Sequence, residues 1–431
     1  MLALRNGILA FVILAATALG NAQEIDTWPD FRGFSGDGIV PGPPRGLPLK
    51  WSEKQNIAWK TAIVGRAWSS PVIAEGKVWL SNATKNGKEM SVVCLDAESG
   101  KLLHDFQLFR NTAVEPLGNP INGYGSPSPV IEKERVYIHF GSYGTAAIDT
   151  ANAKVLWKRT DLPCRHFRGP GSSPVLFANL LILTMDGIDT QYLVALDSSS
   201  GKTVWKTDRS TKWTDVEPGG KIRGGGDFRK AYTTPTFTKV GTETIMISPG
   251  AKACFAYNPT NGRELWHITY AGYSNASRAV IAGENAIINT GYGKPHLVSL
   301  KLDAQARGNI TRSHIVWDIF KRVPKRSSPI IAGKQLYMTT DEGILSCIDL
   351  TTGKEIWSER LRGHFSASPI LADGHIYFFS EMGDCYVIKP GNTFELLASN
   401  RLDDGFMASP AVAGKAIFAR SKTHIYRIET Q

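Results

Sequence analysis

Short apolar segments alternate with turn residues along almost the whole chain. A typical stretch has apolar segments over 335–339 and 344–348, a turn that begins at Asp349, and a last segment that carries Trp357. Segments of this length, bounded by Gly, Pro, Asp and Thr, predict β-strands rather than helices. With the segment that follows Pro329, we expect four short strands in this stretch.

The same stretch recurs, and a four-residue signature marks each copy: two small residues, a proline and usually an apolar residue. The seven complete signatures are Ser69-Ser70-Pro71-Val72, Pro127-Ser128-Pro129-Val130, Ser172-Ser173-Pro174-Val175, Thr233-Thr234-Pro235-Thr236, Ser327-Ser328-Pro329-Ile330, Ala367-Ser368-Pro369-Ile370 and Ala408-Ser409-Pro410-Ala411. An eighth, Ser277-Arg278-Ala279-Val280, lacks the proline. Repeats of about 40 residues with four short strands predict a circular array of sheets.

Several repeats end in the pattern Asp-x-x-[Ser/Thr]-Gly-Lys-x-x-Trp. Asp or Asn accepts hydrogen bonds from the backbone that follows it, and Gly adopts positive φ, so the pair predicts a tight hairpin between third and fourth strands. The tryptophan that follows has a large apolar area, which predicts docking between neighbouring sheets. The expected docking residues are Trp59, Trp157, Trp205, Trp266, Trp317 and Trp357.

These repeats predict an all-β fold, an eight-bladed β-propeller of four-stranded antiparallel blades. The eighth repeat stops after its third strand, at 423–429, whereas 56–60 near the N-terminus forms a strand without a blade of its own. We expect these two strands to pair, because such pairing closes the ring and protects the sheet edges.

Composition and charge agree with this fold. The chain has 42 Gly and 23 Pro, enough turn residues for many short strands. Its net charge is +10, but the Lys and Arg are scattered, so we expect no nucleic-acid partner. The five cysteines include no adjacent pair and no CxxC, and the role of small buried apolar residues explains them better than a disulfide framework or a metal site.

The N-terminus has the pattern of an export signal. Arg5 precedes an apolar stretch over 8–19, and small residues at Gly20 and Ala22 suit cleavage between Ala22 and Gln23. We therefore expect a signal peptide over 1–22, an extension over 23–50 and the propeller over 51–431. The mature protein would be periplasmic or secreted, and no other segment has transmembrane length.

The repeat ending resembles the tryptophan-docking motif of the pyrroloquinoline quinone (PQQ)-like propeller superfamily. That superfamily includes quinoprotein alcohol dehydrogenases and the outer-membrane assembly factor BamB. The runs over 28–33 and 51–60 also resemble exported, mostly uncharacterised members. The resemblance implies the propeller fold, whereas function has to be argued from the site.

A ligand site is expected where the chain enters the innermost strands, at one mouth of the central channel. The side chains just before the signatures include these candidates: Arg66, Trp68, Tyr124, His166, Arg168, Arg229, Tyr232, Asn275, Arg326, His364 and Phe406. Arginines beside aromatic rings suit a planar anion or an acidic peptide, although solvated loops carry the same residues. Acidic residues in the opposing loops, such as Asp341 and Glu381, would neutralise this basic ring.

Three functions are compatible with these residues. The first is a non-catalytic exported module that binds an envelope protein, peptide or glycan as a monomer, as the resemblance to BamB implies. The second, implied by the dehydrogenases, is an oxidoreductase that uses PQQ and Ca²⁺, with Trp68 beneath the quinone and Asn275 and Glu381 near the cation. However, the chain lacks the adjacent cysteine pair of those enzymes. The third is a hydrolase, but the sequence contains no nucleophile elbow and no HExxH pattern that would support it. We therefore assign no catalytic residue and no metal ligand.

Overall fold

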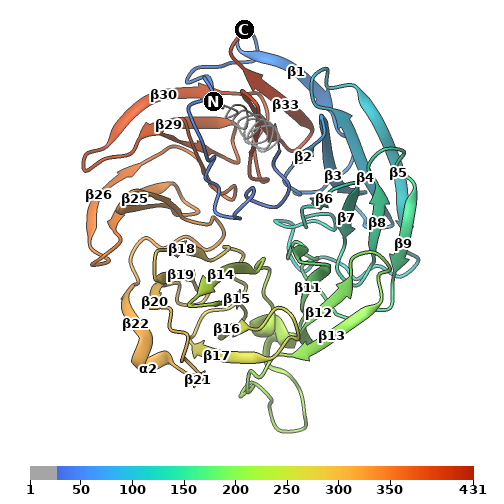
Figure 1. Ribbon diagram of the computed structural model, residues 1–431, viewed down its shortest axis with the longest axis vertical. Coiled ribbons are helices and arrows are strands. Elements are labelled where there is room, and N and C mark those ends of the chain that lie inside the picture. Colours follow the sequence, from blue (N-terminus) through green and yellow to red (C-terminus); the bar gives the residue numbers. More distant parts are fainter. Residues whose placement is uncertain (1–26) are drawn as a thin grey trace, which may run out of the picture.

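A computed structural model describes residues 27–431, which form a ring of eight sheets around a central channel (Figure 1). Each sheet contains four antiparallel strands that run from an inner strand at the channel to an outer strand at the rim, and the sheet of blade 4 has one additional parallel strand. The eight-bladed propeller predicted from the repeats is confirmed. The expected signal peptide lies outside the described residues. No helix within 27–431 is long and apolar enough to cross a membrane.

The strands of each blade follow from the inside to the outside. Blade 1 contains β2 (Val72–Ala74), β3 (Lys77–Ala83), β4 (Glu89–Asp96) and β5 (Leu102–Arg110). Blade 2 contains β6 (Val130–Glu132), β7 (Arg135–His139), β8 (Thr145–Asp149) and β9 (Val155–Arg159). Blade 3 contains β10 (Val175–Phe177), β11 (Leu180–Asp186), β12 (Gln191–Asp197) and β13 (Thr203–Asp208). Blade 4 contains β14 (Thr236–Val240), β15 (Glu243–Pro249), β16 (Ala253–Tyr257) and β17 (Glu264–Thr269).

The second half of the ring follows the same order. Blade 5 contains β18 (Val280–Ala282), β19 (Asn285–Asn289), β20 (Leu297–Lys301) and β22 (Ile315–Ile319). Blade 6 contains β23 (Ile330–Ala332), β24 (Gln335–Thr339), β25 (Ile344–Asp349) and β26 (Glu355–Arg360). Blade 7 contains β27 (Ile370–Ala372), β28 (His375–Phe379), β29 (Asp384–Lys389) and β30 (Glu395–Arg401). Blade 8 contains β31 (Ala411–Ala413), β32 (Ala416–Arg420), β33 (His424–Glu429) and, from the N-terminal side, β1 (Ile57–Ala62).

The pairing of β1 with β33 closes the ring, as predicted. The two strands are antiparallel, with Trp59 opposite Arg427, and they lie side by side at the top of Figure 1. Glu53 reinforces the closure: its Oε1 accepts hydrogen bonds from the Tyr426 hydroxyl at 3.0 Å and from the Asp403 N–H at 2.9 Å. The ends of the chain are therefore joined by backbone and side-chain hydrogen bonds.

The repeat endings form the expected hairpins. In blade 6, Asp349 Oδ1 accepts the N–H of Thr352 at 2.8 Å, and Gly353 has a φ of +70°. The tryptophan of the preceding blade covers this turn, because a Cβ on Gly353 would lie 2.8 Å from the Trp317 ring. Trp317 also donates its indole N–H to the Leu350 carbonyl at 3.0 Å. Glycine is therefore needed both for its backbone conformation and for the close approach of the ring.

The same docking contact occurs at other blade boundaries. The indole N–H groups of four further tryptophans bond backbone carbonyls of the next blade: Trp59 to Ala97, Trp157 to Ser198, Trp205 to Pro259 and Trp357 to Gly391. Trp266 is buried differently, because the extra strand β21 (Gly308–Asn309) pairs with β17 beside it. This strand and the short helix α2 (Thr311–His314) belong to an insertion in blade 5 that the repeat pattern does not reveal.

The core lies between the blades rather than at one centre. For example, Tyr137 and Ala147 of blade 2 pack with Leu183 and Val194 of blade 3. The five cysteines are free and buried, in agreement with the apolar role expected for them. Because each blade buries both faces against its neighbours, the channel wall is rigid enough to position side chains that line it.

Candidate functional site

The repeated signatures form a ring of hydrogen bonds around the channel. In seven of the eight signatures, the second residue donates its backbone N–H to the hydroxyl oxygen of the equivalent residue in the next blade, as from Ser70 to Ser128 at 2.9 Å and from Ser128 to Ser173 at 2.9 Å. Thr234 is the exception, because the equivalent residue of the next blade is Arg278. The last bond, from Ser409 to Ser70 at 3.0 Å, passes between the first and last blades. The small hydroxyl residue in the signature is thus a connector between inner strands.

Arg278 of blade 5 occupies the corresponding position but has no hydroxyl. Its own N–H donates to Ser328, and its side chain turns toward the N-terminal segment. The Arg278 guanidinium lies 3.1 Å from the Asp30 carboxylate and also donates to the Phe31 carbonyl. Burial raises the pKa of Asp30, and the Arg278 charge opposes that rise. The irregular signature is therefore one of the points that hold the N-terminal segment.

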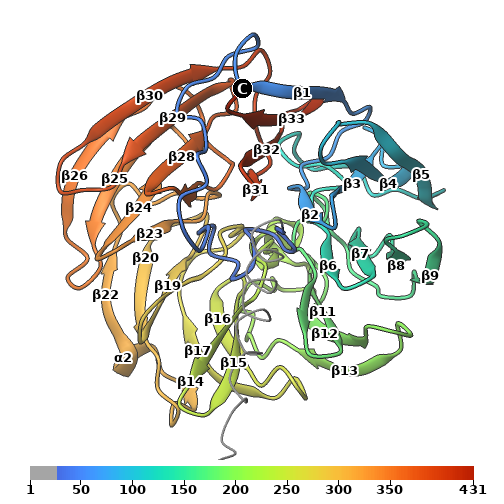
Figure 2. The same ribbon diagram turned by 45° about the horizontal axis from the view of Figure 1, so that its top comes forward.

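This segment, residues 28–40, crosses the channel, as the blue trace at the centre of Figure 2 shows. The Trp28 N–H donates to the Ile73 carbonyl at 2.8 Å in blade 1, and the Val40 N–H donates to the Leu371 carbonyl at 2.8 Å in blade 7. We call the hydroxyl groups at the second position of the signatures the hydroxyl ring. Both carbonyls lie further along the inner strands than this ring does. The segment therefore closes the channel on the side away from the mouth.

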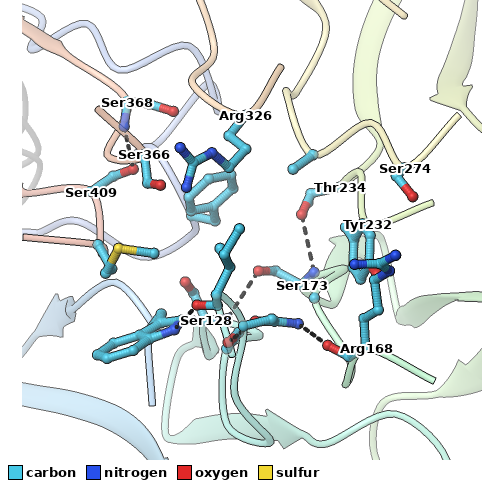
Figure 3. A pocket seen from close by; sticks show the side chains of 18 of the residues that line it. Ser128, Arg168, Ser173, Tyr232, Thr234, Ser274, Arg326, Ser366, Ser368 and Ser409 are labelled. Atoms are coloured by element: carbon cyan, nitrogen blue, oxygen red, sulfur yellow. Dashed lines mark hydrogen bonds between the residues drawn. The ribbon is translucent and has the colours of Figure 1, made fainter. Parts of the chain in front are cut away.

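Above this closure the channel holds a cavity of about 310 Å³, shown in part in Figure 3. Its volume lies at the lower end of the range of small-molecule sites. The lining combines hydroxyls, amides and aromatic rings with a few charges: Phe31, Trp68, Ser70, Asn119, Ile121, Asn122, Ser126, Ser128, Arg168, Gly171, Ser173, Asp227, Tyr232, Thr234, Tyr273, Ser274, Ala276, Tyr292, Arg326, Ser366, Ser368, Met407 and Ser409. Phe31 provides its floor.

Both arginines of the cavity are paired with carboxylates. Arg168 forms two hydrogen bonds of 2.8 Å with Asp227, and Arg326 lies 2.8 Å from Asp341 and 3.0 Å from Glu381. Burial would lower the pKa of Arg326, but these two carboxylates raise it overall. The neutralisation of the basic ring predicted from the opposing loops is thus found at Arg326, and the cavity has no excess positive charge.

The structure brings four of the eleven candidate residues to the cavity: Trp68, Arg168, Tyr232 and Arg326. Arg66 lies outside it, with its guanidinium 5.6 Å from the Trp68 ring. Trp68 itself donates its indole N–H to the Ile121 carbonyl at 2.8 Å, so its orientation is set by the connection between blades 1 and 2. Ligand binding by any of these residues stays a prediction.

Three other candidates are buried in the protein. Tyr124 donates its hydroxyl to the Glu115 carbonyl at 2.9 Å. Phe406 packs edge-on against Phe379, with ring centroids 5.2 Å apart. Asn275 is fully buried, and its Oδ1 has no hydrogen-bond partner among residues 27–431. These side chains support the loops of the mouth instead of facing the channel.

The remaining candidates lie to the side of the cavity. Arg229 is paired with Asp215 at 2.6 Å. His364 lines a separate shallow depression near Met382. His166 is buried, and its Nε2 accepts the Ser142 N–H at 2.9 Å. Burial and the nearby Lys230 charge lower the pKa of His166 well below its usual value, so this ring is neutral.

Sequence reasoning missed the hydroxyls and the floor of the cavity. The hydroxyls belong to the signatures, which we interpreted only as markers of the repeat. The sequence signal for Phe31 is the unusual Arg278 in the eighth signature. That residue by itself does not indicate which segment it contacts. Tyr292 also lines the cavity and was missed, whereas Tyr273, which lies just before the eighth signature as other candidates do, lines it as well. Tyr292 follows β19, and no repeat position marks it.

The residues present do not fit a calcium-bound quinone. Within 27–431, no three His, Cys, Asp or Glu side chains gather where they could hold a metal ion. The lining contains one carboxylate, Asp227, and both of its oxygens are engaged by Arg168. No cysteine lines the cavity. The donor set that calcium requires is therefore lacking at the cavity.

Comparison with known proteins identifies relatives over most of the propeller. A family model described as "Outer membrane protein assembly factor BamB" matches residues 44–163, 166–359 and 255–394. The outer membrane protein assembly factor BamB of Bordetella pertussis is 22% identical over 365 residues, which cover 82% of this chain and 84% of that protein.

Two solved structures show the same architecture. BamB from Moraxella catarrhalis aligns with a TM-score of 0.52 and 16% identity, over 83% of this chain and 94% of that chain. A europium-containing methanol dehydrogenase aligns with a TM-score of 0.65 and 11% identity, over 95% of this chain and 92% of that chain. At such identities the structural likeness extends to the fold alone.

Proposed function

Because the chain belongs to the BamB family of PQQ-like β-propellers, we propose that it is a non-catalytic binding module that works in the cell envelope. The observation that carries this proposal is the family match, which extends over 44–394 and so includes most of the propeller. Relatives such as that of Bordetella pertussis are named as outer membrane protein assembly factors. By the same logic, the partner of this chain is an envelope protein.

The mouth face is the surface that suits such a partner. Antiparallel strands place the connections between blades and the loops between second and third strands at the same end of the ring. Five large exposed apolar side chains occur in these loops within residues 27–431: Val64, Ile121, Val216, Phe320 and Met382. Val64 is 86% exposed and Phe320 61% exposed. Exposed apolar groups on the face where the cavity opens suit a protein partner.

A photo-crosslinking residue at position 320 tests the proposal in the organism's own envelope. Val204, which is 53% exposed on the outer strand β13, is the matched control on the rim. We expect a specific adduct with an envelope protein from position 320 and none from position 204. Equal adducts from both positions, or none from 320, would contradict docking at the mouth face.

A titration with PQQ and Ca²⁺ separates this function from that of a quinoprotein dehydrogenase. We expect no saturable quinone absorbance and no dye-linked alcohol oxidation, because the cavity lacks free carboxylates for the cation. Tight uptake of the quinone would replace the proposal with the oxidoreductase.

A further inference from the structure

The hydroxyl ring directs unused hydrogen-bond donors into the cavity. Six of its members line the cavity: Ser70, Ser128, Ser173, Thr234, Ser368 and Ser409. Their oxygens accept backbone N–H groups at 2.9–3.0 Å, and their side chains are more than nine-tenths buried. In the described part of the chain, none of these six hydroxyls donates to a protein acceptor. Each still has a hydrogen to donate, because a hydroxyl is donor and acceptor at once.

A seventh hydroxyl in the lining lacks a partner altogether. Tyr232 forms part of the wall beside Arg168 (Figure 3), and its buried hydroxyl oxygen has no hydrogen-bond partner within residues 27–431. Buried polar groups are normally paired. A row of hydroxyl donors and an unpaired tyrosine in one cavity therefore point to a ligand with several oxygen acceptors.

Charge and shape narrow the class of this ligand. Two guanidinium groups face three carboxylates, Asp227, Asp341 and Glu381, so the site offers no net attraction to an anion. Five aromatic rings line the cavity: Phe31, Trp68, Tyr232, Tyr273 and Tyr292. Aromatic faces carry negative charge density and attract the C–H groups on the faces of a sugar ring.

We propose that the cavity binds a neutral saccharide. The hydroxyl ring and Tyr232 hydrogen-bond the sugar oxygens, while the aromatic side chains contact its apolar faces. A volume of about 310 Å³ accommodates a short saccharide, and the Phe31 floor makes the site blind, so a glycan enters by its end and cannot thread through. The proposal does not depend on protein docking, since it uses the cavity lining and not the exposed mouth residues.

Ligand-observed NMR and calorimetry on the mature chain test this site with N-acetylglucosamine, methyl glucoside, maltose and cellobiose. We expect saturable binding of at least one probe. A tenfold rise in salt should change its affinity by less than about twofold, because screening acts on charged partners. A soluble glucan with the same sugar end, compared with the free disaccharide, distinguishes a glycan end from a free sugar, and binding of either supports the proposal.

The substitution Tyr232→Phe removes a hydroxyl that has no protein partner, so the fold is retained. We expect the affinity to fall about tenfold, which corresponds to the loss of one hydrogen bond. Tyr377→Phe is the matched control, because Tyr377 is a buried tyrosine of blade 7 whose hydroxyl is also unpaired. The proposal is overturned if no probe binds, if Tyr232→Phe binds as well as wild type, or if glucuronate, PQQ or a tripeptide binds more tightly than every neutral sugar.

Discussion

The substitution Arg278→Ser tests how the channel floor is held. It removes the guanidinium that pairs with Asp30 and bonds the Phe31 carbonyl, and it restores the hydroxyl that other signatures have. Two opposite effects follow. The N-terminal segment loses its buried ion pair, and the inner ring gains one connector. The magnitudes decide which effect dominates.

Removal of one partner from a buried ion pair costs about 3–5 kcal/mol, because the other charge is left without compensation. One added hydroxyl to N–H bond returns about 1 kcal/mol. We therefore expect the free energy of unfolding to fall by about 2–4 kcal/mol. The loss should shrink in acid, since burial raises the pKa of Asp30 and its neutral form no longer needs the guanidinium.

Urea unfolding followed by tryptophan fluorescence measures this change, and limited proteolysis reports release of residues 28–40. The control is the double variant that combines Arg278→Ser with Asp30→Asn, because the amide of Asn leaves no buried charge without a partner. The double variant should therefore be more stable than Arg278→Ser alone. A fall in the free energy of unfolding of less than about 0.5 kcal/mol, the usual range for surface substitutions, would contradict the role of Arg278 in holding the N-terminal segment. A double variant that is no more stable than Arg278→Ser would contradict it as well.

Two further predictions concern the docking contacts and the ring closure. Trp317→Phe removes the indole hydrogen bond to Leu350 and should lower the free energy of unfolding in urea by about 0.5–1.5 kcal/mol. An unchanged free energy of unfolding would contradict a stabilising role for that bond. Burial would raise the pKa of Glu53, but bonds from Asp403, Lys60 and Tyr426 lower it. Its contribution is present above pH 4.5, the ordinary value, and lost as the pH falls. Glu53→Gln should therefore remove a pH-dependent part of stability of less than about 1 kcal/mol, and an unchanged acid profile would contradict this.

Local patterns predicted most of the fold because blades are built from neighbouring segments. The turn from Asp349 to Gly353 and the docking of Trp317 depend on residues at fixed spacing, so each repeat shows them. The closure of β1 on β33 was also predictable, because an unpaired strand at one end matched an incomplete blade at the other. The insertion that contains β21 was missed, since it occurs in a single repeat.

The candidate site was harder to predict because position along the repeat does not decide exposure. Tyr124 and Phe406 occupy the same part of the repeat as Trp68, yet the loops of neighbouring blades bury them. Whether an arginine is available also depends on a carboxylate from another segment, as Asp227 shows for Arg168.

The amino-acid sequence by itself determined the repeat, the blades and the order of strands, because turn chemistry and apolar spacing act over short distances along the chain. Only the tertiary structure decided that hydroxyls of separate signatures join into one ring, and that Phe31 closes the cavity beneath them. Arg278 and Asp30 are 248 residues apart. Such contacts arise from the curvature of the ring and from the path of the N-terminal segment, neither of which has a local signal.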